Sequence, residues 1–234
     1  MASFPFRREW MVKCIEQLID QCDNFYLWLN EYTEVPEELN KFDKDKLHVT
    51  LGEVNLRENG RYLFFNKDCK DDYCFICDDD INYPPDYVEN TLKCFERNGD
   101  NIVTAYYIHN NNSFFAEHKT DEVQDIFINP KNMGIPHYRF GLGTAAFVPS
   151  LMNFQFTYDE LVANYDIEMF IGEQCVARGI KVFTPSRRKN FVTFIRSLEK
   201  NSEIDKFALH LTGAKERTQF TYDYMEMKKR RKSI

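Results

Sequence analysis

Three consecutive acids, Asp78, Asp79 and Asp80, follow the apolar run YCFIC and stand just before two prolines. Carboxylates this close repel one another and raise each other's pKa unless a cation or hydrogen-bond donors take up the charge. In an open α/β sheet, ligands bind beyond the carboxyl ends of the strands, and acids that follow a buried strand reach that edge. The stretch therefore predicts a cation beside these three aspartates.

Strand alternation predicts which of the three carboxylates lie together, and the preference of metals for oxygen ligands then predicts the cation. If the strand continues through the triplet, Asp78 and Asp80 lie on one side and Asp79 on the other, which gives a D-x-D pair. Mg²⁺ and Mn²⁺ prefer oxygen ligands, and Mg²⁺ is commonly held by one or two carboxylates together with substrate phosphates. A solvated acidic loop is the simpler alternative, but an idle acidic cluster after a buried strand is costly. We expect a Mn²⁺ or Mg²⁺ site shared with a nucleotide.

The same acids also fit the spacing of an EF-hand calcium loop. Its ligand positions one, three, five, nine and twelve would be Asp78, Asp80, Asn82, Asp86 and Glu89. Position six of such a loop needs glycine for its sharp turn, and here it is Tyr83, followed by two prolines. The preceding element also has the pattern of a strand rather than a helix, so a calcium loop is not expected.

Composition bounds the class of protein. The 234 residues, 43% of them hydrophobic, suffice for one sizeable core, and the net charge of −7 argues against a general nucleic-acid binder. Seven cysteines, mostly in apolar runs, are typical of free thiols in a cytosolic protein. Cys74 and Cys77 would point to opposite faces of a strand, and no second pair with zinc spacing follows. No apolar run approaches the roughly 18 residues of a membrane span, so we expect a soluble, cytoplasmic protein.

Strand and helix patterns alternate along the chain. Apolar residues recur at helical spacing in 6–21, which predicts an amphipathic helix. Further helices are expected at 61–69, 86–99 and 158–179, and strands at 1–4, 24–30, 47–51, 72–78, 101–109, 141–149 and 180–187. This alternation predicts an α/β fold with a mostly parallel central sheet and helices on both faces. Residues 110–140 are polar and irregular, and five basic residues stand at 228–232.

Six short blocks resemble, in order and spacing, the GT-A-fold, family-2-like glycosyltransferases of bacterial capsule synthesis and of chlorella viruses that glycosylate their own capsids. The blocks are MASFPFRREW, LWLNEYTEVPEEL, GRYLFF, CDDDINYPPDYV, GLGTAAF and DIEMF. The resemblance covers about residues 1–190, and the block that contains the three aspartates is the most specific. It implies a GT-A (Rossmann-like) fold in a single domain, 1–215, followed by a helical, basic tail, 216–234.

The resemblance also implies a donor site for a nucleotide sugar, most commonly a UDP-sugar. The family's second nucleotide-binding segment is usually Asp-x-Gly-Lys. Here Arg61 stands in the position of the lysine and keeps its positive charge, and Glu58 stands in the position of the aspartate. Asp80 would bind the metal directly, with Asp78 beside it and near the ribose. His109 is a weaker metal candidate, because histidine also serves as a satisfied strand-end residue. The remaining nucleotide-binding candidates are Ala2, Ser3, Phe4, Pro5, Arg8 and Asp79.

On the acceptor side, the resemblance assigns a wall to the turn at Gly143, Thr144 and Ala145, where small residues let the backbone approach a sugar. Asp166 matches the acid that deprotonates the acceptor hydroxyl in inverting members. A helix-terminal acid favoured by the dipole is the alternative for Asp166. Glu168 would face elsewhere on a helix. Two further residues, Arg187 and Arg188, would either neutralise the departing diphosphate or be surface charge.

These expectations combine into a metal-dependent glycosyltransferase that moves a sugar from a nucleotide-sugar donor to a carbohydrate acceptor, in the host cytoplasm if the protein is viral. The resemblance to a multidomain enzyme leaves room for further catalytic domains after this one. A sugar-phosphate nucleotidyltransferase should show a glycine-rich loop near its start, and MASFPFRR has none. An aspartyl-phosphate phosphatase would need Thr or Val where Asn82 stands. A non-catalytic carbohydrate-binding domain of the same fold stays open.

Overall fold

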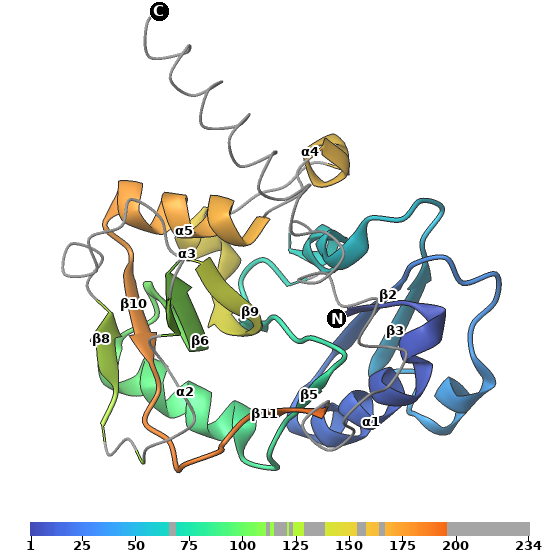
Figure 1. Cartoon of the computed structure of the whole chain (residues 1–234), viewed down its shortest axis with the longest axis horizontal. Coiled ribbons are helices and arrows are strands. Elements are labelled where there is room, and N and C mark those ends of the chain that lie inside the picture. The colour runs from blue at the N-terminus through green and yellow to red at the C-terminus, as the bar shows by residue number, and fades with distance from the viewer. Residues whose placement is uncertain are drawn as a thin grey trace, which may run out of the picture.

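The computed structural model describes residues 1–65, 69–110, 113–114, 121, 124–128, 139–153, 158–163 and 167–195. The described strands form two larger sheets, one on each side of the centre of the molecule, and helices cover both (Figure 1). A two-stranded ribbon of β5 (Ile81–Asn82) and β11 (Thr193–Phe194) lies below the centre in Figure 1. No helix in the described part of the chain is both long enough and apolar enough to cross a membrane.

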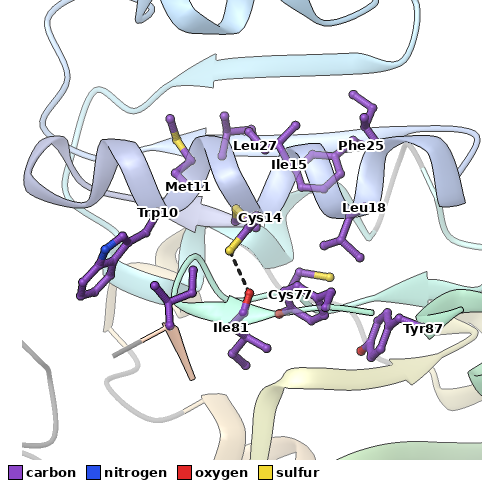
Figure 2. Packing of buried hydrophobic residues seen from close by; sticks show 14 of the residues in the cluster. Trp10, Met11, Cys14, Ile15, Leu18, Phe25, Leu27, Cys77, Ile81 and Tyr87 are labelled. Atoms are coloured by element: carbon purple, nitrogen blue, oxygen red, sulfur yellow. Dashed lines mark hydrogen bonds between the residues drawn. The ribbon is translucent and has the colours of Figure 1, made fainter. Parts of the chain in front are cut away.

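The first sheet is parallel and carries the start of the chain. Its order is β1 (Ala2–Ser3), β2 (Phe25–Leu29) and β3 (Leu47–Leu51), and Ala2 pairs with Trp28. Helix α1 (Arg8–Leu18) packs its apolar side on one face of this sheet, next to Leu27 (Figure 2). The 3₁₀ helix η4 (Arg57–Phe64) contacts β1 and β2, and its Phe64 ring lies on Tyr26, which points to the other face of the sheet.

The second sheet has six strands and is mostly antiparallel. Its order is β4 (Cys74–Phe75), β9 (Arg139–Phe147), β6 (Ile102–Asn110), β10 (Lys181–Thr184) and β8 (Ile126–Ile128), and β7 (Ser113–Phe114) pairs with β6. Among the described strand pairs of this sheet, only that of β6 with β10 is parallel. Val103 and Ala105 pack with α5 (Ile167–Arg178), whereas Ile102 packs with α2 (Tyr87–Asn98). The two helices therefore cover opposite faces of this sheet, as Figure 1 shows.

Shorter helices complete the described chain. They are η1 (Pro5–Arg7), η2 (Ile19–Gln21), η3 (Glu37–Lys41), α3 (Pro149–Met152) and α4 (Tyr158–Ala163).

The expected α/β class, with helices on both faces of the sheets, is confirmed, but the expectation of one mostly parallel sheet needs correction. Strand β9 inserts between β4 and β6 and is antiparallel to both. The sequence patterns concealed this arrangement, because the alternation of a strand reports which face it buries and not the direction in which its neighbours run. The parallel pairs are those of β1, β2 and β3 and that of β6 with β10.

Candidate functional site

The three aspartates lie in a turn rather than in a strand. Strand β4 ends at Phe75, and the next backbone groups each bind a single partner: Ile76 N–H donates to the Ala145 carbonyl at 2.8 Å, and Asp78 N–H donates to the Tyr83 hydroxyl at 2.8 Å. The predicted alternation of Asp78 and Asp80 against Asp79 is therefore wrong, because strand geometry stops before the triplet. The structure sorts the acids differently: Asp79 and Asp80 face one arginine and Asp78 faces another.

Asp79 is fixed by the end of β1. Its Oδ2 accepts a hydrogen bond from the Ser3 hydroxyl at 2.6 Å, and its Oδ1 pairs with Arg7 Nη1 at 2.7 Å. Burial raises the pKa of Asp79 to about 6, with Asp80 adding to the shift and Arg7 and Ser3 opposing it. Both carboxylate oxygens are thus bound inside the protein, and Asp79 holds the turn against the first sheet.

Arg7 is a candidate site residue that the sequence analysis did not predict. Its Nη2 lies 3.7 Å from Asp80 Oδ2, so one guanidinium group bridges Asp79 and Asp80. Burial would lower the pKa of Arg7, but the two carboxylates outweigh it and raise that pKa. Arg8, the predicted nucleotide contact, instead pairs with Glu38 on the surface. The available signal was Pro5, which starts η1 and turns the chain so that neighbouring arginines point in different directions.

Asp78 pairs with Arg61, which is buried in η4. The side chain of Asp78 is 34% exposed, against 4% for Asp79 and 6% for Asp80, so Asp78 is the acid most open to a ligand. Arg61 is held in place by close packing of its neighbour Gly60 on Trp28. A Cβ added to Gly60 would lie 2.7 Å from Trp28 Nε1 and closer still to two ring carbons. This glycine therefore lets η4 approach β2, and this approach places Arg61 where it pairs with Asp78.

Tyr83 joins the aspartate turn to β9. Its buried hydroxyl accepts the Asp78 N–H and donates to the Gly143 carbonyl at 2.5 Å. Gly143 lies against Asp78 itself, because an added Cβ would be 2.5 Å from Asp78 Cγ and 2.7 Å from its Cβ. The predicted contact of Gly143 with a sugar is untested, but its small size has a direct use: it leaves room for the Asp78 side chain.

Three aspartates, Ser3, Arg7 and Arg61 thus form one cluster, and all of these residues except Ser3 lie within the part of the chain that matches a known family. The model of the family described as glycosyl transferase family 2 matches residues 7–157, which include Arg7, Arg61, the aspartates and Gly143. The chain belongs to glycosyl transferase family 2. A search of curated protein sequences found no significant match. The α/β architecture of this family-2 chain agrees with the GT-A, Rossmann-like fold that the sequence predicted.

The other nucleotide-side candidates of this family-2 glycosyltransferase lie at the end of β1. Ala2 is in β1, and Phe4 stacks on Phe6 with ring centroids 5.6 Å apart. The Phe4 carbonyl accepts the Tyr32 hydroxyl at 3.0 Å, while Pro5 is exposed at the start of η1. Phe4 and Pro5 lie in the chain between Ser3 and Arg7, which both bind Asp79, and Ala2 immediately precedes Ser3.

The acceptor-side candidates fall partly outside the described residues. Asp166 lies outside them, and so does the basic run at 228–232. His109 and Glu168 are placed only as backbone, in β6 and α5. Thr144 is buried in β9, where its hydroxyl accepts the Tyr107 N–H at 3.2 Å. The roles of these residues therefore stay predictions.

The two arginines after β10 have separate positions. Arg188 forms a two-pronged ion pair with Asp86 at 2.7 and 3.0 Å, which lowers the pKa of Asp86. Arg187 is buried and donates to the Pro185 carbonyl at 3.4 Å. The calcium-loop alternative also fails here, because Asp86 is bound by Arg188 and Asn82 belongs to β5.

The donor set of the aspartate turn fits a hard divalent cation. Asp78 and Asp80 offer carboxylate oxygens, which Mg²⁺ and Mn²⁺ prefer, and Asp78 reaches solvent. Among the described residues, no group of three or more His, Cys, Asp or Glu side chains is arranged to hold a metal ion. A cation at this turn would consequently take its remaining ligands from water or from a diphosphate.

Proposed function

We propose that the chain is a metal-dependent glycosyltransferase that moves a sugar from a nucleotide-diphosphate donor, a UDP-sugar, to a carbohydrate hydroxyl. The acceptor would be a glycan such as that of a capsule or a viral capsid. Family membership supports glycosyl transfer in general. The observation that carries the metal-dependent form is the charge of the aspartate turn and its exposed member, Asp78.

The charge balance favours a metal together with the donor. The three carboxylates carry three negative charges and Arg7 and Arg61 carry two positive ones, so these five side chains leave one net negative charge. A nucleotide diphosphate alone would be repelled by that charge, whereas a divalent cation would turn it into one net positive charge. Donor and metal are therefore expected to bind together, each strengthening the other.

Each residue of the cluster has a proposed role. Asp80 and Asp78 would hold the Mn²⁺ or Mg²⁺, and the bound metal would act as a Lewis acid that stabilises charge on the leaving diphosphate. Asp79 would position the turn through Ser3 and Arg7. Arg61 fixes the orientation of Asp78. The acceptor proton is assigned to Asp166 on the basis of the sequence resemblance, with His109 as a further metal candidate on the same basis.

A thermal-shift panel tests metal-linked donor binding. UDP, GDP, CDP and TDP are each added with Mn²⁺ or with EDTA. A ligand at about a hundred times its Kd stabilises the native state by roughly 2.7 kcal/mol, so a specific nucleotide gives a clear shift. UDP with Mn²⁺ is expected to raise the melting temperature most. Equal shifts in Mn²⁺ and in EDTA for every nucleotide would rule out the metal-linked site.

Substitutions locate that site. Asp80→Asn and Asp78→Asn are expected to remove most of the metal-dependent shift. The matched control is Asp159→Asn, which changes an exposed acid of α4 and should leave the shift intact. A full metal-dependent shift in both site variants would place the metal elsewhere on the protein.

Asp166→Asn tests the proposed base. A general base contributes typically about 10² to 10⁴ in rate and little to donor binding. The variant should lose transfer to an added acceptor while its UDP–Mn²⁺ shift stays near wild type. Undiminished transfer would exclude Asp166 as the base and direct attention to Glu168 or Asp159, or to a retaining mechanism.

A non-catalytic carbohydrate-binding domain is the second candidate. It is favoured by one observation, namely that an arginine already faces every aspartate of the triplet, so the acids also have a structural use. Slow donor hydrolysis separates the two functions. A transferase should hydrolyse UDP-sugar above background in a reaction that EDTA abolishes, and a binding domain should show none.

A further inference from the structure

A cavity of about 450 Å³ lies at the start of β2, and Arg61 and Cys77, which are neighbours of the aspartate turn, form part of its wall. It opens between the start of β2, helix α2, η4 and β4, and its apolar walls include Leu18, Phe25, Phe64, Phe75, Val88 and Leu92. Four cysteines also line it, namely Cys22, Cys69, Cys74 and Cys77. All seven cysteines of the chain are free thiols, so more than half of them share this one cavity.

Two of these cysteines are in contact. Cys74 Sγ donates to the Cys69 backbone carbonyl at 3.0 Å, and Cys69 Sγ donates to the Phe64 carbonyl at 3.4 Å. The thiols also interact with each other, and this contact, together with burial, raises the pKa of Cys74. Cys69 is partly exposed, whereas Cys74 is buried at the start of β4. The Cys74 sulfur is thus held against the Cys69 backbone at the cavity wall, and Cys69 is the more exposed residue of the two.

We infer that Cys69 and Cys74 form a modification site: a dithiol that converts to an intramolecular disulfide by exchange with a small disulfide entering the cavity. The Cys69 thiolate attacks one sulfur of the reagent, which forms a mixed disulfide and releases the first thiolate. The Cys74 thiolate then attacks the Cys69 sulfur, which closes the protein disulfide and releases the second thiolate. The two protein thiols are oxidised, the reagent disulfide is reduced to two thiols, and both protons pass to them.

The rim of the cavity selects the reagent by charge. Asp23, Asp71 and Asp72 line the cavity and are exposed, so they mark its opening to solvent. Lys70 pairs with Asp71 at 3.7 Å, so the attraction for a cationic disulfide and the repulsion of an anionic one rest mainly on Asp23 and Asp72, and salt screens this effect. The assigned substrate class is therefore a small cationic or neutral disulfide. Cys69 is the entry thiol because Cys74 is buried behind it.

The test uses the full chain and cystamine, a dicationic disulfide. After brief exposure at neutral pH, the reaction is stopped with acid, remaining thiols are alkylated, and tryptic peptides are mapped by mass spectrometry. A Cys69–Cys74 disulfide links peptide 68–70 to peptide 71–93, and fragmentation distinguishes Cys74 from Cys77 in the longer one. This linked peptide is expected as the first major product. A first product at Cys22, or a link to Cys77, would overturn the assignment.

Cysteine variants and changes of salt concentration test this assignment further, and neither test depends on an enzymatic activity of the protein. Cys74→Ser should stop the reaction at a cysteamine adduct on Cys69, and Cys69→Ser should abolish early reaction. Cys175→Ser, which changes a buried thiol outside the cavity, is the control and should react like wild type. Cystamine should react about tenfold faster than the anionic 3,3′-dithiodipropionate at low salt, and high salt should bring the rates together. Linkage at the same rate in protein unfolded by urea would show that the fold does not build the site.

Discussion

Gly143→Ala is the sharpest test of how the aspartate turn is built. The added Cβ would lie 2.5 Å from Asp78 Cγ, whereas ordinary van der Waals contact begins at 3.4 Å. The Asp78 carboxylate must therefore move by about 1 Å, the difference between these two distances. Arg61 and the Tyr83 hydroxyl resist the movement, since one holds the carboxylate and the other holds the Asp78 N–H. We expect a loss of about 1–3 kcal/mol in the free energy of unfolding, as for other overpacked sites.

The effect on ligand binding should exceed the effect on stability. Mg²⁺ demands ligands at 2.0–2.1 Å in near-ideal geometry, so a displacement of about 1 Å removes Asp78 from any metal shell. Gly143→Ala should therefore abolish the UDP–Mn²⁺ thermal shift and lower the melting temperature of the free protein by about 2–12 °C. Gly99→Ala and Gly179→Ala are matched controls, because they have positive φ and no atoms within 4 Å of an added Cβ. They should cost some stability and leave the metal-linked shift unchanged.

A double substitution identifies the cause. Asp78→Ala removes two of the three Asp78 atoms that the new Cβ would meet, so Gly143→Ala should cost less stability in that background than in wild type. Additive costs, or a Gly143→Ala protein that keeps the full metal-dependent shift, would refute the argument that this glycine makes room for Asp78.

Two other substitutions probe the supports around the site. Tyr83→Phe leaves two buried backbone groups without their partner and should cost about 1–3 kcal/mol in chemical denaturation, whereas Tyr73→Phe, which removes an exposed hydroxyl, should cost little. Asp125→Asn tests the hydrogen bonds that Asp125 accepts from Arg97, the Ser186 N–H and Asn98. Burial would raise the pKa of Asp125, but these three partners outweigh it and lower that pKa. Because a lowered pKa stabilises the fold only above the unfolded value of about 3.9, the stability difference from wild type should be full at neutral pH and shrink as the pH falls below about 4; a difference independent of pH would contradict this.

The periodicity of apolar residues in the sequence correctly predicted helices and strands that pack one face against the core. The helix expected at 6–21 appears as α1 with η1 and η2 at its ends, and its periodic residues Trp10, Met11, Cys14, Ile15 and Leu18 are buried. Figure 2 shows Cys14 reaching across to the Ile81 carbonyl, where its thiol donates at 3.1 Å. The strands at 24–30 and 47–51 were also predicted correctly. These elements were predictable because their patterns report local periods of 3.6 and 2.

The aspartate turn was predictable in composition but not in geometry. The triplet required positive charge, and the structure supplies it from Arg7 and Arg61, far away in the sequence. Strand alternation could not assign the carboxylates, because β4 ends at Phe75, before the triplet, and the next strand, β5, begins only at Ile81. Choosing Arg7 over Arg8 required the direction of the chain after Pro5, which a motif does not contain.

The aspartate turn joins the two sheets, and this explains why so many supports converge on it. Asp79 is bound to Ser3 and Arg7, at the end of the first sheet, while the Asp78 N–H is tied through Tyr83 to Gly143 in the second. A shift of one sheet against the other would therefore strain the turn between the Asp78 N–H and the Asp79 carboxylate. The buried ion pairs hold the turn in one arrangement, so a ligand that bound there would not have to order it, and more of its interaction energy would appear as affinity.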